Sequence, residues 1–323
     1  MNGRLEHELK VEEKINNKLK TLPFIFTEFY YYLKPNKSIN TIIRYIGYVE
    51  DFMNYVSRGL NNNEFYKVVK ASTIRQYLSS LEKKVVDGKI KRMGPEMQAT
   101  RWSAINTFFK FLIMDDYISE NPMLKTARPK TNVNHQITYL EPEEIETVLK
   151  FIEETANERL KNRELCIISL ALSTGLRISA ISQANIEDID FQTNTIHVIE
   201  KEEYYRDIPF GTKMRGLLLS WIKDRELYFN GGNDGPLFIS QHRNRLSNDA
   251  IRDIVNKYTQ NLNKHIKVHD LRKSTATNLA KQGFDIRTIQ EIVGHKNVNT
   301  TMRYIAVLDE EKKRASAALD GLI

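Results

Sequence analysis

The chain has 323 residues, 28% of them charged and 41% hydrophobic, which is typical of a globular protein long enough for two domains with separate cores. Lysine and arginine number 48 against 41 aspartates and glutamates, and the formal net charge of +7 favours a polyanionic partner without proving one. The single cysteine, Cys166, excludes a disulfide framework, and no apolar run reaches the length of a transmembrane helix.

Residues 1–21 are predicted to form a charged N-terminal extension, in which acidic and basic side chains alternate. The opening MNGRLEHELKVEEK is too charged for a secretory signal, so we expect a cytoplasmic protein without membrane association. Its sparse apolar positions predict a short solvated helix, with docking on DNA or on a neighbouring protein as the alternative.

Residues 22–120 are predicted to form a domain of four helices. The dense segment FIFTEFYYYL forms the first helix, Ser38 is a candidate cap of the second, and Ser72 or Thr73 opens the third. The fourth runs from Met93 to Met114, where aromatic residues recur at helical spacing. We expect these aromatic rings to form the core rather than to stack on bases.

The run KKVVDGKIKR lies between the third and fourth helices. Such runs are usually just solvated, but in a DNA-binding protein this one is the best candidate for phosphate contacts. The predicted DNA-binding side chains are therefore basic residues of this run and of the helix that follows, namely Lys83, Lys84, Lys89, Lys91, Arg92 and Arg101.

Residues 121–138 contain two prolines and several basic residues but little periodicity, so they are predicted to be an interdomain linker. A second domain is expected over 139–308. Its helix ELCIISLALSTG ends at Gly175, and Arg177 follows where it can reach a ligand rather than solvent. The alternating runs DIDFQ, TIHVIEK and RDIPF predict an antiparallel sheet with a turn at Glu202–Tyr205. The expected fold class is mainly α with a small antiparallel β-sheet.

The stretch 267–304, KVHDLRKSTATNLAKQGFDIRTIQEIVGHKNVNTTMRY, contains the densest set of chemically useful side chains. His269 and Arg272 lie three residues apart, which places them on one face of a helix. Gly283 ends that helix, and Asp285 starts a second one that Gly294 ends. His295 therefore lies at a helix terminus, and Tyr304 follows nine residues later.

These side chains are suited to phosphoryl transfer through a covalent tyrosyl ester. A guanidinium matches phosphate oxygens, an imidazole moves a proton near neutral pH, and a phenol can attack phosphorus. Each part alone is more often a surface ion pair or a packed side chain. The whole string decides otherwise, because HDLRKSTATNLA followed by IVGHKNVNTTMRY resembles the catalytic domain of tyrosine recombinases, the phage-integrase and Xer family.

The resemblance implies which residues react. The string STGLRIS resembles the first arginine motif of the family, which gives that role to Arg177. The family's catalytic lysine corresponds to Lys201, although the glycine and second lysine of its motif are missing here, and an ordinary strand-end lysine is the alternative. The implied catalytic residues are Arg177, Lys201, His269, Arg272, His295 and the nucleophile Tyr304.

Two supporting positions depart from the family pattern. Ala180 stands where an acid is common, and Lys273 stands where a histidine is common, so the orientation of neighbouring groups is in doubt but the reaction class is not. His265 and His269 lie four apart, but no third ligand of suitable spacing is visible, and we discount a metal site. The implied chemistry needs neither a metal nor a nucleotide cofactor.

The helical region 22–120 resembles the core-binding domain of the same family. The implied partner is double-stranded DNA, bound by a homotetramer that exchanges strands through a Holliday junction. The tail 309–323 is predicted to be a C-terminal helix that packs on the neighbouring subunit or, alternatively, in cis. Type IB topoisomerase activity and a non-cleaving DNA-binding regulator are the competing functions. Integration or excision of a mobile element is slightly favoured over resolution of dimers, because the turn after Lys201 and the supporting residues depart from the Xer pattern, and any accessory protein stays open.

Overall fold

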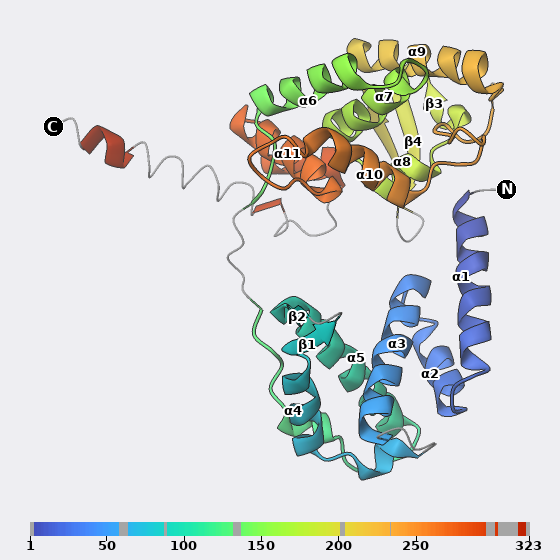
Figure 1. Ribbon diagram of the computed structural model, residues 1–323, viewed down its shortest axis with the longest axis vertical. Coiled ribbons are helices and arrows are strands. Elements are labelled where there is room, and N and C mark those ends of the chain that lie inside the picture. The colour runs from blue at the N-terminus through green and yellow to red at the C-terminus, as the bar shows by residue number, and fades with distance from the viewer. Residues whose placement is uncertain are drawn as a thin grey trace. The chain divides into compact units, whose positions relative to one another are not determined.

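The computed structural model describes residues 3–57, 64–86, 89–131, 137–200, 204–232, 234–294, 301–302 and 316–320. Their contacts divide the chain into two compact units, Met1–His135 and Gln136–Ile323. The chain is mainly helical with small antiparallel sheets, which confirms the expected fold class (Figure 1). In the described part of the chain, no helix is both long and apolar enough to cross a membrane.

The first unit is a helical assembly built around aromatic side chains. Its core includes Phe108, whose ring lies edge-on to Phe29 at 5.1 Å and stacks on Phe65 at 5.8 Å. All three rings are fully buried, and the burial of Phe108 confirms the core role expected for that aromatic position of the predicted fourth helix. The elements are α1 (Gly3–Leu19), α2 (Ile25–Leu33), α3 (Ile39–Ser57), α4 (Ala71–Ser80), β1 (Lys83–Val86), β2 (Lys89–Arg92) and α5 (Pro95–Met114).

Helix α1 corrects the expectation of a solvated extension. Ile15 and Leu19, one helical turn apart, are 1% and 9% exposed and belong to the core of the first unit. Two ion pairs hold the same helix to its neighbours, from Lys18 to the α3 residue Glu50 and from Lys34, just after α2, to Glu12. Helix α1 therefore docks on the unit through Ile15 and Leu19, while Leu9 is exposed.

The basic run between α4 and α5 forms a two-stranded antiparallel hairpin, β1–β2, which was not predicted from the sequence. Valine and isoleucine favour strands, and the Asp87-Gly88 dipeptide between the strands is typical of a two-residue hairpin turn. Helix α4 begins at Ala71, earlier than expected, with no side-chain cap at Lys70.

The second unit is built around the buried helix α7 (Glu158–Thr174), which contacts α6 (Pro142–Thr155) and α8 (Ile178–Gln183). It also contacts α9 (Thr212–Phe229), α10 (Asn248–Thr259) and α11 (Val268–Lys281). Figure 1 shows these helices around the short strands of the sheet. Helix α12 (Ile286–Val293) packs on α11 through a small cluster of Ala276, Ala280, Ile289 and Val293.

Local capping explains where the last helices begin. Ser247 accepts the backbone N–H of Ala250 at the start of α10, which confirms that predicted cap. Asp285 accepts the N–H groups of Arg287 and Thr288 at the start of α12, as predicted. Two helix boundaries thus follow directly from short polar side chains.

The sheet of the second unit has the order β3-β4-β5 and is antiparallel throughout, with β3 (Ile189–Asp190), β4 (Thr195–Glu200) and β5 (Tyr204–Pro209). Val198 on β4 is opposite Arg206 on β5. Strand β5 begins at Tyr204, so Tyr204 and Tyr205 belong to the strand and not to the expected turn. The pairing of β4 with β5 therefore continues to Tyr204, two residues into the segment that the sequence pattern predicted as a turn.

Candidate active site

Arg177 lies at the sharp junction between α7 and α8. Gly175 ends α7 with a left-handed backbone (φ 62°), and a Cβ there would lie 3.0 Å from Val293 Cγ1. Leu176 is buried, which leaves Arg177 as the N-cap residue of α8, with its side chain half-buried. Its Nη2 donates to the carbonyl of Gly294, 3.3 Å away.

Helix α11 presents His269 and Arg272 in its first turns. Asp270 stabilises the start of the helix, because its carboxylate accepts the backbone N–H of Lys267 at 2.8 Å and pairs with Lys273 at 2.6 Å. Lys273 stands where the family commonly has histidine, and its ammonium group forms an ion pair with Asp270 in the first turn of α11.

Arg272 is 2% exposed and connects the ends of two other helices. Its Nη1 donates to the carbonyl of Gly175 at 2.6 Å, and its Nη2 donates to the carbonyl of Gly294 at 3.1 Å. The partial negative charge of carbonyls at helix C-termini favours a buried cation at this point. Arg177 and Arg272 thus share one acceptor.

A pocket of about 490 Å³ brings these groups together. It is lined by residues of the α7–α8 junction, of α10 and of the start of α11, among them Arg177, His269 and Arg272. Three of the six residues implied as catalytic therefore line one cavity. Lys201, His295 and Tyr304 lie outside the described residues.

His269 lies at the exposed edge of this pocket. Partial burial of the imidazole lowers its pKa from the ordinary value of 6.5, and the positive charges of Arg272 and Lys273 lower it further. The imidazole is therefore neutral at neutral pH and can accept a proton. Burial and the neighbouring Arg206 likewise lower the pKa of Arg177, which stays a cation throughout the physiological range.

The structure adds pocket residues that sequence reasoning missed. Arg252 and Asn256, one turn apart on α10, line the pocket, as do His265 and Lys267 just before α11. The four-residue spacing of Arg252 and Asn256 on a capped helix was the available signal. For His265, the four-residue spacing to His269 suggests only a metal ligand. Among the described residues, no three histidine, cysteine, aspartate or glutamate side chains gather where they could hold a metal ion.

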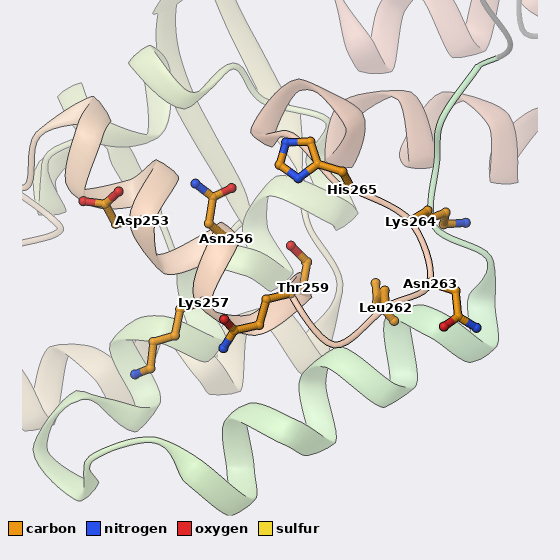
Figure 2. A pocket seen from close by; sticks show the side chains of 9 residues that line it. Asp253, Asn256, Lys257, Thr259, Leu262, Asn263, Lys264 and His265 are labelled. Atoms are coloured by element: carbon orange, nitrogen blue, oxygen red, sulfur yellow. The ribbon is translucent and has the colours of Figure 1, made fainter. Parts of the chain in front are cut away.

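A second polar cavity of about 690 Å³ adjoins the first, since Asn256 and His265 line both. Figure 2 shows it between the end of α10 and the loop that leads to α11, where Lys257 and Lys264 contribute its positive charge. Lys257 pairs with the buried Glu164 at 3.3 Å. The carboxylate of Glu164 thus partly neutralises the positive charge that Lys257 brings to this cavity.

The predicted DNA-binding residues lie on the first unit. The backbones of Lys83, Lys84, Lys89 and Lys91 belong to the β1–β2 hairpin, while their side chains lie outside the described part; Arg92 is exposed. Arg101 on α5 is engaged within the unit. Its guanidinium donates to Asp51 at 2.7 Å and to Tyr77 at 2.9 Å and lies over the ring of Tyr48.

The comparisons with known proteins agree with this geometry. The model of the phage integrase family matches residues 138–311, which is most of the second unit. The chain belongs to this family. It is a tyrosine recombinase, an enzyme that exchanges DNA strands.

Two curated relatives show how far the likeness extends. Tyrosine recombinase XerC of Mannheimia succiniciproducens is 28% identical over 281 residues, covering 86% of this chain and 90% of that protein. XerC of Haemophilus influenzae strain PittEE is 30% identical over 222 residues, covering 68% of this recombinase and 73% of its relative. The likeness therefore includes much of the first unit as well.

Solved structures share the fold. The XerH site-specific recombinase bound to palindromic difH substrate aligns with a TM-score of 0.65 and 22% identity, over 87% of this chain and 80% of XerH. The Tn1549 transposon integrase in complex with circular intermediate DNA aligns with a TM-score of 0.65 and 19% identity, over 87% and 93% of the two chains. Both show the recombinase fold in this protein.

Proposed function

We propose that this tyrosine recombinase breaks and rejoins DNA through a 3′-phosphotyrosyl intermediate formed on Tyr304. The observation that carries the proposal is the pocket in which Arg177 and Arg272 approach the same carbonyl while His269 lies at its edge. Two guanidiniums in one cavity can stabilise the charge that develops on a phosphodiester under attack, and a neutral imidazole beside them can accept the proton of the nucleophile.

In the proposed step, the oxygen of Tyr304 attacks phosphorus and the bond from phosphorus to the 5′-oxygen breaks. Arg177 and Arg272 hold the non-bridging oxygens and stabilise the charge that develops on them. His269 accepts the phenolic proton, a role that its lowered pKa supports because the ring is neutral before the reaction. The ester retains the energy of the broken bond, so a 5′-hydroxyl from another duplex reverses the step.

Lys201 and His295 are assigned from the sequence resemblance. Lys201 donates a proton to the departing 5′-oxygen, and His295 hydrogen-bonds the scissile phosphate or supports the nucleophile. In the sequence, His295 directly follows Gly294, whose carbonyl accepts both arginines. This adjacency supports a place for His295 beside the pocket.

DNA is the proposed partner, and the two units are proposed to divide its recognition. We assign core binding to 22–120, including the β1–β2 hairpin, and catalysis to 139–308, with a tetramer on two synapsed sites. The XerH and Tn1549 integrase structures contain DNA, which supports this partner. Integration and excision of a mobile element is favoured over dimer resolution, because the Lys201 segment departs from the Xer pattern.

The test begins with duplexes selected for binding from a randomised library, each rebuilt as a series with single nicks at successive positions. A nick next to the cleavage site releases a short fragment and traps the covalent complex. The wild-type chain is expected to give a protease-sensitive adduct without added metal, and Tyr304→Phe is expected to give none. Selective binding without an adduct would indicate a regulator that does not cut, and relaxation of any supercoiled DNA without site exchange would indicate a topoisomerase.

A further inference from the structure

Arg206 is a buried cation outside the set of catalytic residues implied by the sequence. It lies on β5 and is 8% exposed. Its Nη2 donates to the carbonyls of Glu291 and Ile292, at 2.7 Å and 2.6 Å. These carbonyls belong to the last turn of α12, so a strand side chain binds the C-terminus of a helix that lies 85 residues later in the chain.

Gly294 shows how closely this guanidinium approaches the turn. The residue ends α12 with a left-handed backbone (φ 62°), and a Cβ added there would overlap Nη1 of Arg206 and lie 2.9 Å from Nε. Only glycine adopts this backbone without strain and leaves room for the guanidinium. Arg206 and Gly294 therefore form a matched pair, because the guanidinium occupies the space that a side chain at position 294 would need.

The turn that Arg206 holds also presents the shared acceptor of the pocket. The carbonyl of Gly294 accepts Nη2 of Arg177 at 3.3 Å and Nη2 of Arg272 at 3.1 Å. Three guanidiniums thus surround one helix C-terminus, two of them from the pocket and one from the sheet. A shift of this turn changes the position of the acceptor and hence the alignment of both pocket arginines.

We propose that Arg206 is a positioning residue for strand cleavage, because it fixes the end of α12 and through the Gly294 carbonyl sets the orientation of Arg177 and Arg272. The inference rests on the proposed function, in which these two arginines hold the scissile phosphate. Arg206 acts through the backbone of α12 and has no direct role in the chemistry. Loss of its hydrogen bonds to the end of α12 is therefore expected to slow cleavage far more than it weakens binding.

The test uses the nicked duplex on which the wild-type chain forms an adduct. Arg206→Met removes the donors but keeps much of the side-chain volume. Misplacement of reacting groups by about 1 Å can lower a rate by about 100-fold, so we expect single-turnover cleavage at saturating DNA to fall by about 10- to 100-fold. The Kd for the duplex is expected to change by less than about threefold, and Arg206→Lys is expected to recover part of the rate.

A second Arg–Gly pair in the same unit is the matched control. Arg225 on α9 is 2% exposed and donates to the carbonyls of Gly232 and Asp234, and a Cβ added at Gly231 would lie 2.6 Å from its Cγ. None of these residues lines the described pocket. Arg225→Met therefore reports the effect of losing a buried arginine that binds loop carbonyls, and it should leave the cleavage rate per folded molecule unchanged.

Gly294→Ala tests the Arg206–Gly294 pair by changing the glycine instead of the arginine. Alone it should lower the cleavage rate because its methyl group displaces the guanidinium of Arg206. In the Arg206→Met background the same change should have a smaller effect, so the two losses should combine less than multiplicatively. If Arg206→Met melts below the assay temperature, Gly294→Ala and Arg206→Lys carry the test.

Equal cleavage rates for the wild type and the Arg206 variants, or equal losses for Arg206→Met and Arg225→Met per folded molecule, would overturn the inference alone. A parallel rise in Kd that accounts for the lost rate would also overturn it. A wild-type chain that forms no adduct on any selected duplex would overturn the proposed function and the inference with it. Adduct formation by the wild-type chain thus distinguishes failure of the inference from failure of the proposed function.

Discussion

The helix that carries His269 and Arg272 is held by a hydroxyl whose removal has a calculable effect. Ser274 on α11 is fully buried; its Oγ accepts the backbone N–H of Leu140 at 2.7 Å and donates to the carbonyl of Asp270 at 2.7 Å. Ser274→Ala removes one atom and leaves the buried N–H of Leu140 without this acceptor. An unsatisfied buried donor costs about 1–3 kcal/mol in the free energy of unfolding.

For a unit of this size each kcal/mol lowers Tm by about 2–4 °C, so we expect Ser274→Ala to lower Tm by about 2–12 °C in a thermal melt. Thr277 on the same helix provides the contrast. Its Oγ1 is buried and has no hydrogen-bond partner among the described residues, so Thr277→Val should leave Tm unchanged or raise it. Equal losses from the two variants would refute the reasoning, since packing of α11 and not hydrogen bonding would then explain both.

Two further predictions concern proton transfer and the first unit. Burial, Arg272 and Lys273 lower the pKa of His269, and an imidazole accepts a proton only when it is neutral. As the pH is decreased, the cleavage rate of the wild type should therefore begin to fall only below the ordinary histidine pKa of about 6.5. Lys273→Met removes one of these charges and should move the fall to higher pH, and an unmoved profile would contradict the assignment. Phe108→Ala should cost about 3–5 kcal/mol in denaturant unfolding of the first unit, since the ring is fully buried among aromatic neighbours, and a loss below about 1 kcal/mol would show that the core refills the space.

The sequence predicted those parts of the fold that local chemistry determines. Ser247 and Asp285 began helices because a short polar side chain accepts the first free N–H groups. Gly175 and Gly294 ended helices because a left-handed backbone favours glycine. The resemblance to the family's motifs also selected Arg177, His269 and Arg272, which line one pocket.

Other parts were missed because their cause is tertiary or because a local signal was given too little weight. No local pattern connects Arg206 to the end of α12, since the contact forms only when β5 and α12 meet. The spacing of Ile15 and Leu19 did indicate a docked face on α1, but the surrounding charges favoured a solvated helix. The Asp87-Gly88 dipeptide is a local signal for the β1–β2 hairpin, but the positive charge of the surrounding run is the more conspicuous feature of this segment.

The central claim is that the protein joins DNA to Tyr304, and mapping the linked residue tests it most directly. The trapped adduct would be trimmed with nuclease, digested with trypsin and analysed by mass spectrometry. We predict a nucleotide joined through its 3′-phosphate to the peptide YIAVLDEEK, which begins at Tyr304 and contains no other tyrosine, together with a released strand whose 5′-hydroxyl a kinase can label directly. Attachment to any other residue, or through a 5′-phosphate, would contradict the account.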